Sequence, residues 1–129
     1  MDCNQLGFPE SSPEKAVVDS RGRARFTPHP TIIAGIPAMH KVFCGSHHNI
    51  AIAHDGSAWS WGFGEVWQVG QGPHTAENPS GDIEVPTKIV NTATKGVNMI
   101  TGGAGGQFSV LCGIAEGLDK VNVSHGKAK

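Results

Sequence analysis

The sequence predicts an all-β fold built from small antiparallel sheets, and composition is the first reason for this. Gly occurs 18 times and Pro 8 times in 129 residues, while charged residues make up 16% of the chain. This is too rich in turn residues for a bundle of helices. Hydrophobic residues make up 38% of the chain, which is too many for a disordered segment. Short strands joined by many turns fit both values.

A β-hairpin is the clearest local element, and it is the second reason for the all-β prediction. Residues 49–53 and 57–61 both suit β-strands, and Asp55-Gly56 stands between them. We expect a two-residue type I′ turn here, because Asp and Gly tolerate the positive φ angles of that turn.

The second strand of this hairpin has one bulky face and one small face. Side chains alternate along a strand, so Trp59 and Trp61 share one face while Ala58 and Ser60 share the other. Trp59 and Trp61 are therefore expected to pack within the core or between sheets, rather than to stack on a ligand.

The rest of the chain predicts shorter strands and longer connections. Further strands are expected at residues 41–44, 87–90, 97–100 and 108–112. Residues 70–82 and 102–106 are connections rich in Gly and Pro, and the charged residues 10–25 are expected to form a surface loop. No segment keeps a helical period over about eleven residues.

Three sequence markers recur in the same order, at spacings of about 60 residues. Residues 5–7 (Gln-Leu-Gly) return as 68–70 (Gln-Val-Gly), residues 30–33 (Pro-Thr-Ile-Ile) return as 86–89 (Pro-Thr-Lys-Ile), and residues 44–50 align with 104–110. An ordered set of repeats predicts small sheets stacked around a ring, each burying its faces against its neighbours.

The repeats divide the chain into four parts. Residues 1–44 are expected to end one repeat and to carry an inserted loop, 45–103 to form one complete repeat or blade, 104–116 to form the first strand of a further repeat, and 117–129 to be a flexible tail. The prediction is therefore about two blades of an incomplete β-propeller, with open strand edges.

The motifs of the complete repeat resemble those of the regulator of chromosome condensation family. These motifs are the small-Gly-x-x-His start at residues 44–48, the Asp-Gly turn at 55–56, the Trp-Gly pair at 61–62 and the Gln-hydrophobic-Gly close at 68–70. Residues 22–31, 60–65, 84–89, 91–94 and 105–110 are similar to the last blades of fungal exchange factors for the GTPase Ran. The resemblance covers residues 2–113. One departure is Phe108, which stands where the repeat often has His.

The resemblance implies a seven-bladed β-propeller that acts as a guanine-nucleotide exchange factor. Its implied partners are a Ran-type small GTPase and, through regions missing from this chain, chromatin or the nucleosome; its implied localisation is the nucleus. Met1 stands where the family would be in mid-repeat, so the chain is expected to be a truncated gene model or an expressed fragment with little exchange activity of its own. The family's basic N-terminal region, which serves nuclear import and chromatin contact, is absent. The alternative is a binding or scaffold module of a larger protein, for example a ubiquitin ligase; a pseudogene product is a third possibility.

Other functional classes find little support in the sequence. The formal net charge of −1 predicts no attraction to nucleic acid or to an anionic membrane, and no apolar run of about 18 residues predicts a membrane span. Cys3, Cys44 and Cys112 have no paired spacing, which favours a reducing compartment. We predict no catalytic residue, cofactor or metal, since Gly-x-Ser-x-Gly and P-loop motifs are absent.

Two neighbouring histidines are the first candidates for contact with a partner. A zinc site built on Cys44 and His47 would lack a second pair of ligands. The alternative is that one histidine ends a strand by hydrogen bonding while the other faces solvent. The resemblance implies that His48, at the motif position, faces the GTPase, and His47 is included as its neighbour.

The long loop after the hairpin holds the other candidates. Its carboxylates, Glu65, Glu77, Asp82 and Glu84, are expected to be solvated, or else to contact a partner, since binding residues favour loops on rigid scaffolds. Trp67 lies beside this loop. The candidate partner contacts are therefore His47, His48, Glu65, Trp67, Asp82 and Glu84.

Overall fold

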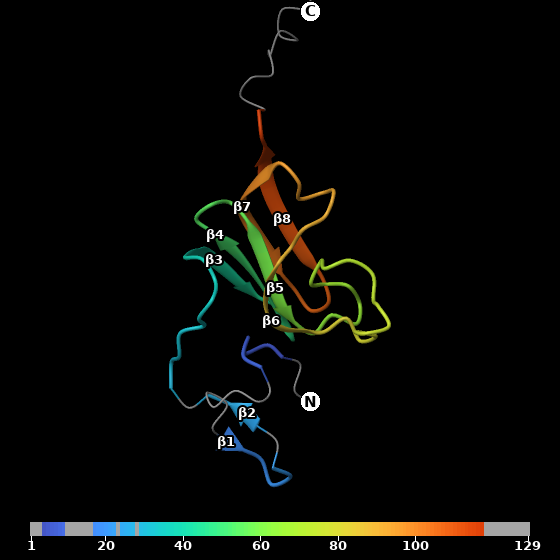
Figure 1. The fold of residues 1–129 in the computed structure, drawn as a ribbon. Helices are drawn as coiled ribbons and strands as arrows, with labels where there is room; N and C mark the ends of the chain where they lie inside the picture. Colours follow the sequence, from blue (N-terminus) through green and yellow to red (C-terminus); the bar gives the residue numbers. More distant parts are fainter. Residues whose placement is uncertain (1–3, 10–16, 23, 28, 118–129) are drawn as a thin grey trace, which may run out of the picture.

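The described residues form eight strands in three antiparallel sheets and contain no helix (Figure 1). The computed structural model describes residues 4–9, 17–22, 24–27 and 29–117. The strands are β1 (Val17–Val18), β2 (Ala24–Phe26), β3 (Met39–Cys44), β4 (His48–Ala53), β5 (Ala58–Gly62), β6 (Ile83–Lys88), β7 (Val97–Ala104) and β8 (Ser109–Ala115). The all-β prediction is confirmed.

In every sheet, strands that are adjacent in the sequence pair with each other. β3, β4, β5 and β6 form one sheet in that order, whereas β7 pairs with β8 and β1 with β2. The β7–β8 sheet lies across one face of the four-stranded sheet (Figure 1). The hairpin ends of the two larger sheets correspond, because Cys44 pairs with Asn49 in β3–β4 and Ala104 pairs with Ser109 in β7–β8.

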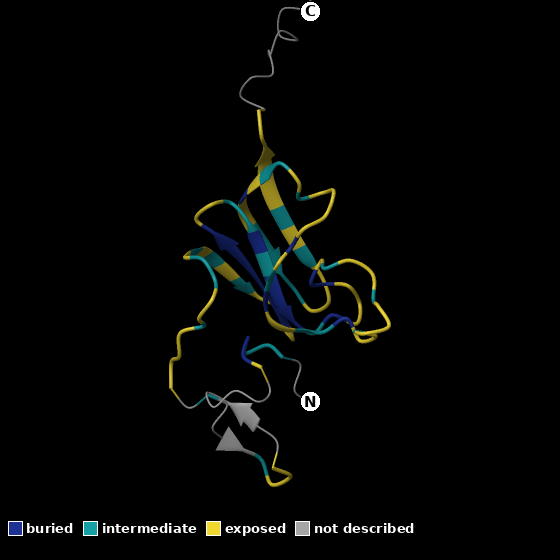
Figure 2. Cartoon of the chain, viewed as in Figure 1, coloured by how far each residue is buried: buried dark blue, intermediate teal, exposed yellow. Residues whose placement is uncertain are grey.

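One face of the four-stranded sheet forms the core with β7 and β8. Ile50 pairs with Ser60 and Ile52 with Ala58, so this face combines β4 isoleucines with small β5 side chains. The buried cluster contains Ile50, Ile52, Ala58, Ile89 and Met99, with Phe43, Val97, Ala104 and Leu111 packed against it. Figure 2 shows β4 and β5 buried, while the strands that flank them are largely exposed.

The opposite face of this sheet contacts the N-terminal segment. Asn49 Nδ2 and Trp61 Nε1 both donate hydrogen bonds to the backbone oxygen of Gln5, at 2.8 and 3.0 Å. Gly7 lies so close to Trp61 that a Cβ there would approach its Nε1 to 3.1 Å. Both faces of β5 therefore pack within the structure, the small residues toward β7 and β8 and Trp61 against the N-terminal segment, so the two faces differ as the alternation of Trp and small residues predicts.

The turn between β4 and β5 differs from the predicted two-residue type I′ turn. Four residues, 54–57, connect the strands, and Gly56 has the positive φ of this turn, 84°. Asp55 instead accepts hydrogen bonds on Oδ1 from the backbone N and the Oγ of Ser57, at 2.9 and 2.6 Å. The side-chain bonds of Asp55 stabilise a wider turn, which a rule based on the Asp-Gly pair alone does not consider.

Two further strand predictions need correction. The strand expected at 87–90 is β6, which begins at Ile83 and ends at Lys88. It includes Pro86, which is tolerated because β6 is an edge strand of its sheet. The strand expected at 97–100 continues to Ala104, so the glycines at 102 and 103 belong to β7 rather than to a connection.

The terminal predictions are only partly within the described residues. Residues 10–25 were expected to form a loop, but β1 and β2 pair within this segment; residues 10–16 lie outside the described part of the chain. The predicted flexible tail, 117–129, also lies outside it except for Gly117.

The outer face of β8 is apolar and exposed. Val110 and Ile114 lie on this face with exposed fractions of 50% and 48%. The described residues provide no counterpart of β5 and β6 that would pair with β8. An apolar face beside an unpaired strand edge favours association with another chain.

We therefore expect the 129-residue chain to self-associate, or to melt without a cooperative transition. The V110K/I114K variant should shift the chain toward monomer, because two ammonium groups would oppose burial of this face. Analytical ultracentrifugation measures the effect, and V90K is the control, since Val90 is 78% exposed but lies outside β8. A wild-type chain that is monomeric and melts sharply would contradict this expectation.

Candidate functional site

In each of the two larger sheets, an aromatic ring packs on a glycine in the turn that leads into the second strand. A Cβ on Gly45 would lie 2.4 Å from His48 Cε1, and one on Gly105 would lie 2.2 Å from Phe108 Cε1. The backbone bonds also match, because Gly45 N donates to His48 O at 2.8 Å and Gly105 N to Phe108 O at 2.9 Å. The Gly-x-x-aromatic motif is therefore a tight turn whose ring covers its own first residue.

The two glycine turns also contact each other. Ser46 N donates a hydrogen bond to Gly105 O at 3.2 Å, and a Cβ on Gly45 would lie 2.4 Å from that same oxygen. The backbones of the two turns are crowded together at this contact. No side chain fits at position 45 without moving the neighbouring sheet.

The residue after each aromatic ring bonds to the Gln-x-Gly segment of the preceding repeat. Ser109 Oγ donates to Gln68 O at 2.8 Å, and Asn49 Nδ2 donates to Gln5 O at 2.8 Å. Equivalent positions of two repeats thus make equivalent bonds between sheets. Sequence reasoning marked both motifs but missed Asn49, Ser109 and the two glutamine carbonyls as bonding partners, although the regular spacing of the motifs was the available signal.

His48, on β4, also bonds to the Ser109 side chain on β8. Its side chain is 1% exposed, and its Nε2 lies 2.7 Å from Ser109 Oγ. Because the Ser109 hydroxyl donates to Gln68 O, His48 Nε2 carries the proton and donates to Ser109. Burial lowers the pKa of His48 below its usual value, opposed by the Phe108 backbone and assisted by His47.

The loop from Gly62 to Ile83 is held by its own polar groups. Asp82 Oδ1 accepts a hydrogen bond from Gly64 N at 2.9 Å, and Asn78 Nδ2 donates to Asp82 O at 2.9 Å. His74 Nε2 lies 3.2 Å from Gly64 O, and its ring makes a T-shaped contact with that of Trp67, with centroids 6.0 Å apart. These bonds give the loop a defined shape.

The predicted contact residues divide into two groups. Glu65, Trp67, Glu84 and His47 are exposed, and the His47 ring lies 6.2 Å from that of Phe63. His48 is buried between the sheets and Asp82 is half-buried, so both shape the surface from below. His47 and His48 follow the alternative in which one histidine is bonded and the other faces solvent. Their roles in partner binding stay predictions.

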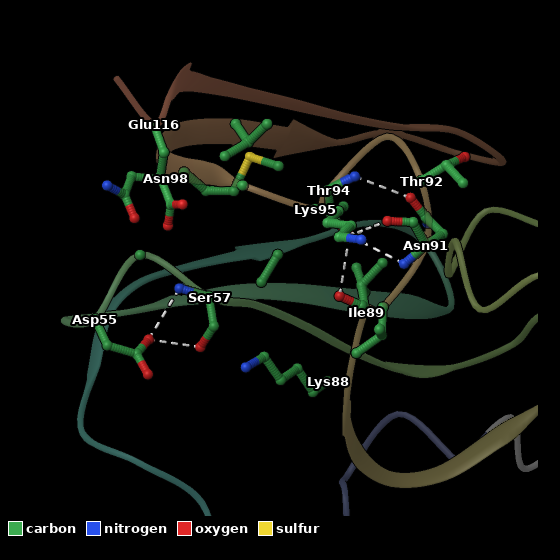
Figure 3. Close-up of a pocket in the computed structure, with 16 residues that line it drawn as sticks. Asp55, Ser57, Lys88, Ile89, Asn91, Thr92, Thr94, Lys95, Asn98 and Glu116 are labelled. Carbon is green, nitrogen blue, oxygen red and sulfur yellow. Dashed lines mark hydrogen bonds between the residues drawn. The ribbon is translucent and has the colours of Figure 1, made fainter. Parts of the chain in front are cut away.

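A cleft lies at the other end of the two larger sheets (Figure 3). It contains Lys88, Lys95 and Glu116, together with the bonded pair Asp55 and Ser57. Hydrogen bonds from Ser57 hold the pKa of Asp55 below its usual value. Other side-chain hydrogen bonds in the cleft, between Asn91 and Thr94, stabilise the turn at Asn91.

The described part of the chain holds neither a cluster of metal ligands nor a helix able to cross a membrane. No three His, Cys, Asp or Glu side chains there are grouped as metal ligands. Nor does that part hold a helix with the length and apolarity that a bilayer span requires.

Small antiparallel sheets, stacked face to face with repeated contacts, define a segment of a β-propeller repeat protein. Residues 55–112 match the regulator of chromosome condensation (RCC1) repeat. This segment is therefore an RCC1 repeat, and the chain is similar over most of its length to fungal proteins that include a guanine nucleotide exchange factor.

Individual relatives match most of this chain but only a minor part of their own length. The guanine nucleotide exchange factor SRM1 of Saccharomyces cerevisiae is 45% identical over 115 residues, which are 88% of this chain and 23% of SRM1. The protein pim1 of Schizosaccharomyces pombe is 42% identical over 88% of this chain and 20% of its own. The solved structure of Prp20p from Saccharomyces cerevisiae superposes with a TM-score of 0.82 at 40% identity, covering 99% of this chain and 28% of that one.

The contact between the glycine turns predicts that alanine is destabilising at position 45 but not at position 103. We expect G45A to destabilise the packing of β4 on β8 by about 1–3 kcal/mol, because the added methyl overlaps Gly105 O and the His48 ring. G103A is the matched control, since a Cβ there meets nothing within 4 Å. Amide hydrogen exchange of β4 in the V110K/I114K background measures both; equal exchange in the two variants would contradict this account.

The lowered pKa of His48 predicts a loss of stability at acidic pH. The unfolded chain binds a proton near pH 6.5, whereas the folded chain does so only at lower pH. Stability contributed by neutral His48 is therefore complete above pH 6.5 and declines as pH falls below it, by at most about 1.4 kcal/mol per pH unit.

The H48F variant tests the assignment, because Phe108 shows that phenylalanine fits the equivalent position. We expect H48F to be less stable than wild type at pH 8, by about 1 kcal/mol for the lost hydrogen bond, and less sensitive to pH between 6.5 and 5. Amide exchange of β4 and β8 across this range provides the measurement. An unchanged pH dependence in H48F would show that another group is responsible.

Proposed function

We propose that this chain is part of an exchange factor that promotes GDP release from a Ran-type nuclear GTPase. The observation that carries the proposal is its 45% identity, over 88% of the chain, to the guanine nucleotide exchange factor SRM1. Prp20p, which shares the fold, was solved together with a study of its binding to Gsp1p and histones.

Nucleotide exchange of this kind needs no covalent chemistry. The factor binds the nucleotide-free GTPase more tightly than the nucleotide-bound form, and this difference in affinity shifts the equilibrium toward release. The protein must therefore present a surface that keeps its shape while the GTPase changes. If the contact residues were mobile, the cost of ordering them on binding would reduce this difference in affinity.

The chain contributes a rigid part of such a surface. The bonds from Asn49, His48 and Ser109 join successive sheets at the end that carries the glycine turns. The exposed candidates His47, Glu65 and Trp67 lie at this end, because Phe63 N bonds to His47 O across it.

The other candidates and partners complete the proposal. Glu84 is a further exposed contact candidate, while Asp82 and His48 position the backbone beneath the surface. Chromatin contact and nuclear residence belong to the whole protein, and regions outside this chain supply them.

A replacement experiment separates the exchange factor from the scaffold alternative. Residues 2–116 are placed in yeast SRM1 in exchange for the matching segment, and release of fluorescent GDP from the yeast Ran-type GTPase is measured. We expect the replacement protein to keep at least a tenth of the SRM1 rate, and the 129-residue chain alone to add nothing to intrinsic release. A replacement protein that folds but does not exchange would favour a scaffold role, and rapid release by the chain alone would refute the assignment of most activity to other blades.

A further inference from the structure

Two repeats of this chain place a left-handed residue immediately before the Gln-x-Gly segment. Asn4 precedes Gln5 with φ 58°, and Trp67 precedes Gln68 with φ 66°. The fold therefore requires this backbone conformation at the position in both repeats. Asn adopts it at little cost, whereas a bulky aromatic residue is a strained exception there.

Trp67 adopts this strained backbone conformation although its side chain is largely exposed. Its side chain is 65% exposed, and its ring contact among the described residues is a T-shaped contact with His74. The backbone is nevertheless fixed, because Trp67 N donates to Gly64 O at 2.8 Å and Gly70 N donates to Trp67 O at 3.0 Å. The turn thus holds an indole outward in one position, and strain of this kind is found at contact sites.

Gln68 provides a second, independent sign of a bound group. Its side chain is 5% exposed and its Oε1 accepts a hydrogen bond from Val66 N at 3.1 Å, which directs the amide nitrogen the other way. That Nε2 is buried without a partner in the described structure, and Gln68 is one of the residues that line a groove bordered by Trp67 and Phe108. A buried N–H donor of this kind requires an acceptor such as a peptide carbonyl.

The charge of the surrounding loop identifies the chemistry of the partner. Residues 63–84 contain Glu65, Glu77, Asp82 and Glu84 but no Lys or Arg. Glu65 stands in the same turn as Trp67 and is exposed, as is Val66 at 47%. A carboxylate in the same turn as an exposed indole suits a cation, which is attracted both by the carboxylate and by the face of the ring.

We propose that the turn from Gly64 to Trp67 docks a basic segment of the GTPase. A lysine or arginine side chain of that segment lies on the Trp67 indole beside Glu65, and a backbone carbonyl of the segment accepts a hydrogen bond from Gln68 Nε2. The inference rests on the proposed function, since it takes the GTPase as the partner. It adds the residue that anchors the contact and the charge that it recognises.

The test uses the replacement protein and the W67N variant, which installs the residue that the chain itself uses at position 4. We expect KM for the GTPase to rise at least fivefold with kcat nearly unchanged, because the contact contributes to binding. Thermal stability should rise, because Asn relieves the left-handed strain. W67F should restore part of the affinity through its ring, and E65Q should raise KM and weaken the dependence of KM on salt.

I32N is the matched control, because Ile32 is a large apolar residue that is 90% exposed elsewhere on the chain; its KM should equal that of the wild type. An unchanged KM in W67N overturns this inference and leaves the exchange function intact. If W67N lowers stability, its KM is no longer informative, and the E65Q variant provides the test. An unchanged KM and salt dependence in E65Q then overturn the inference. If the replacement protein with the wild-type segment folds but shows no exchange, the proposed function fails instead.

Discussion

The structure depends on one contact that occurs in two successive repeats. The backbone oxygen of the glutamine before a hydrophobic-Gly pair accepts a hydrogen bond from the side chain that follows the next Gly-x-x-aromatic turn. Asn49 provides this bond to Gln5, and Ser109 provides it to Gln68. A small sheet cannot bury both faces alone, so such a contact sets the distance and register at which its neighbours stack. The glycines are required because each aromatic ring occupies the space of a Cβ.

Much of the fold follows from local patterns in the sequence. Alternation along β5 predicted that its faces differ, and the internal repeats predicted matching turns at Gly45 and Gly105. The misses have physical causes that local patterns do not contain. Asp55 stabilises a wider turn through its carboxylate, and β6 begins before Pro86 because an edge strand needs no N–H there.

The candidate site was less predictable, because its properties arise from contacts between distant residues. The sequence indicated that His48 belongs to a motif, but its burial and its bond to Ser109 depend on a strand 61 positions away. Trp67 was identified as lying beside a loop, whereas its left-handed backbone emerged only from the structure. Gln68 links both features: its carbonyl joins the sheets, while the residue before it carries the exposed indole. Packing between sheets therefore fixes the surface offered to a partner.

The most direct test of the contact between sheets is a double-mutant cycle on His48 and Ser109. Amide exchange of β4 and β8 is measured for H48F, S109A and the double variant in the monomeric background. A bonded pair predicts that the two losses are not additive, with a coupling of about 0.5–3 kcal/mol. Strictly additive losses would show that the two side chains act independently, and the account of how successive sheets are joined would then be wrong.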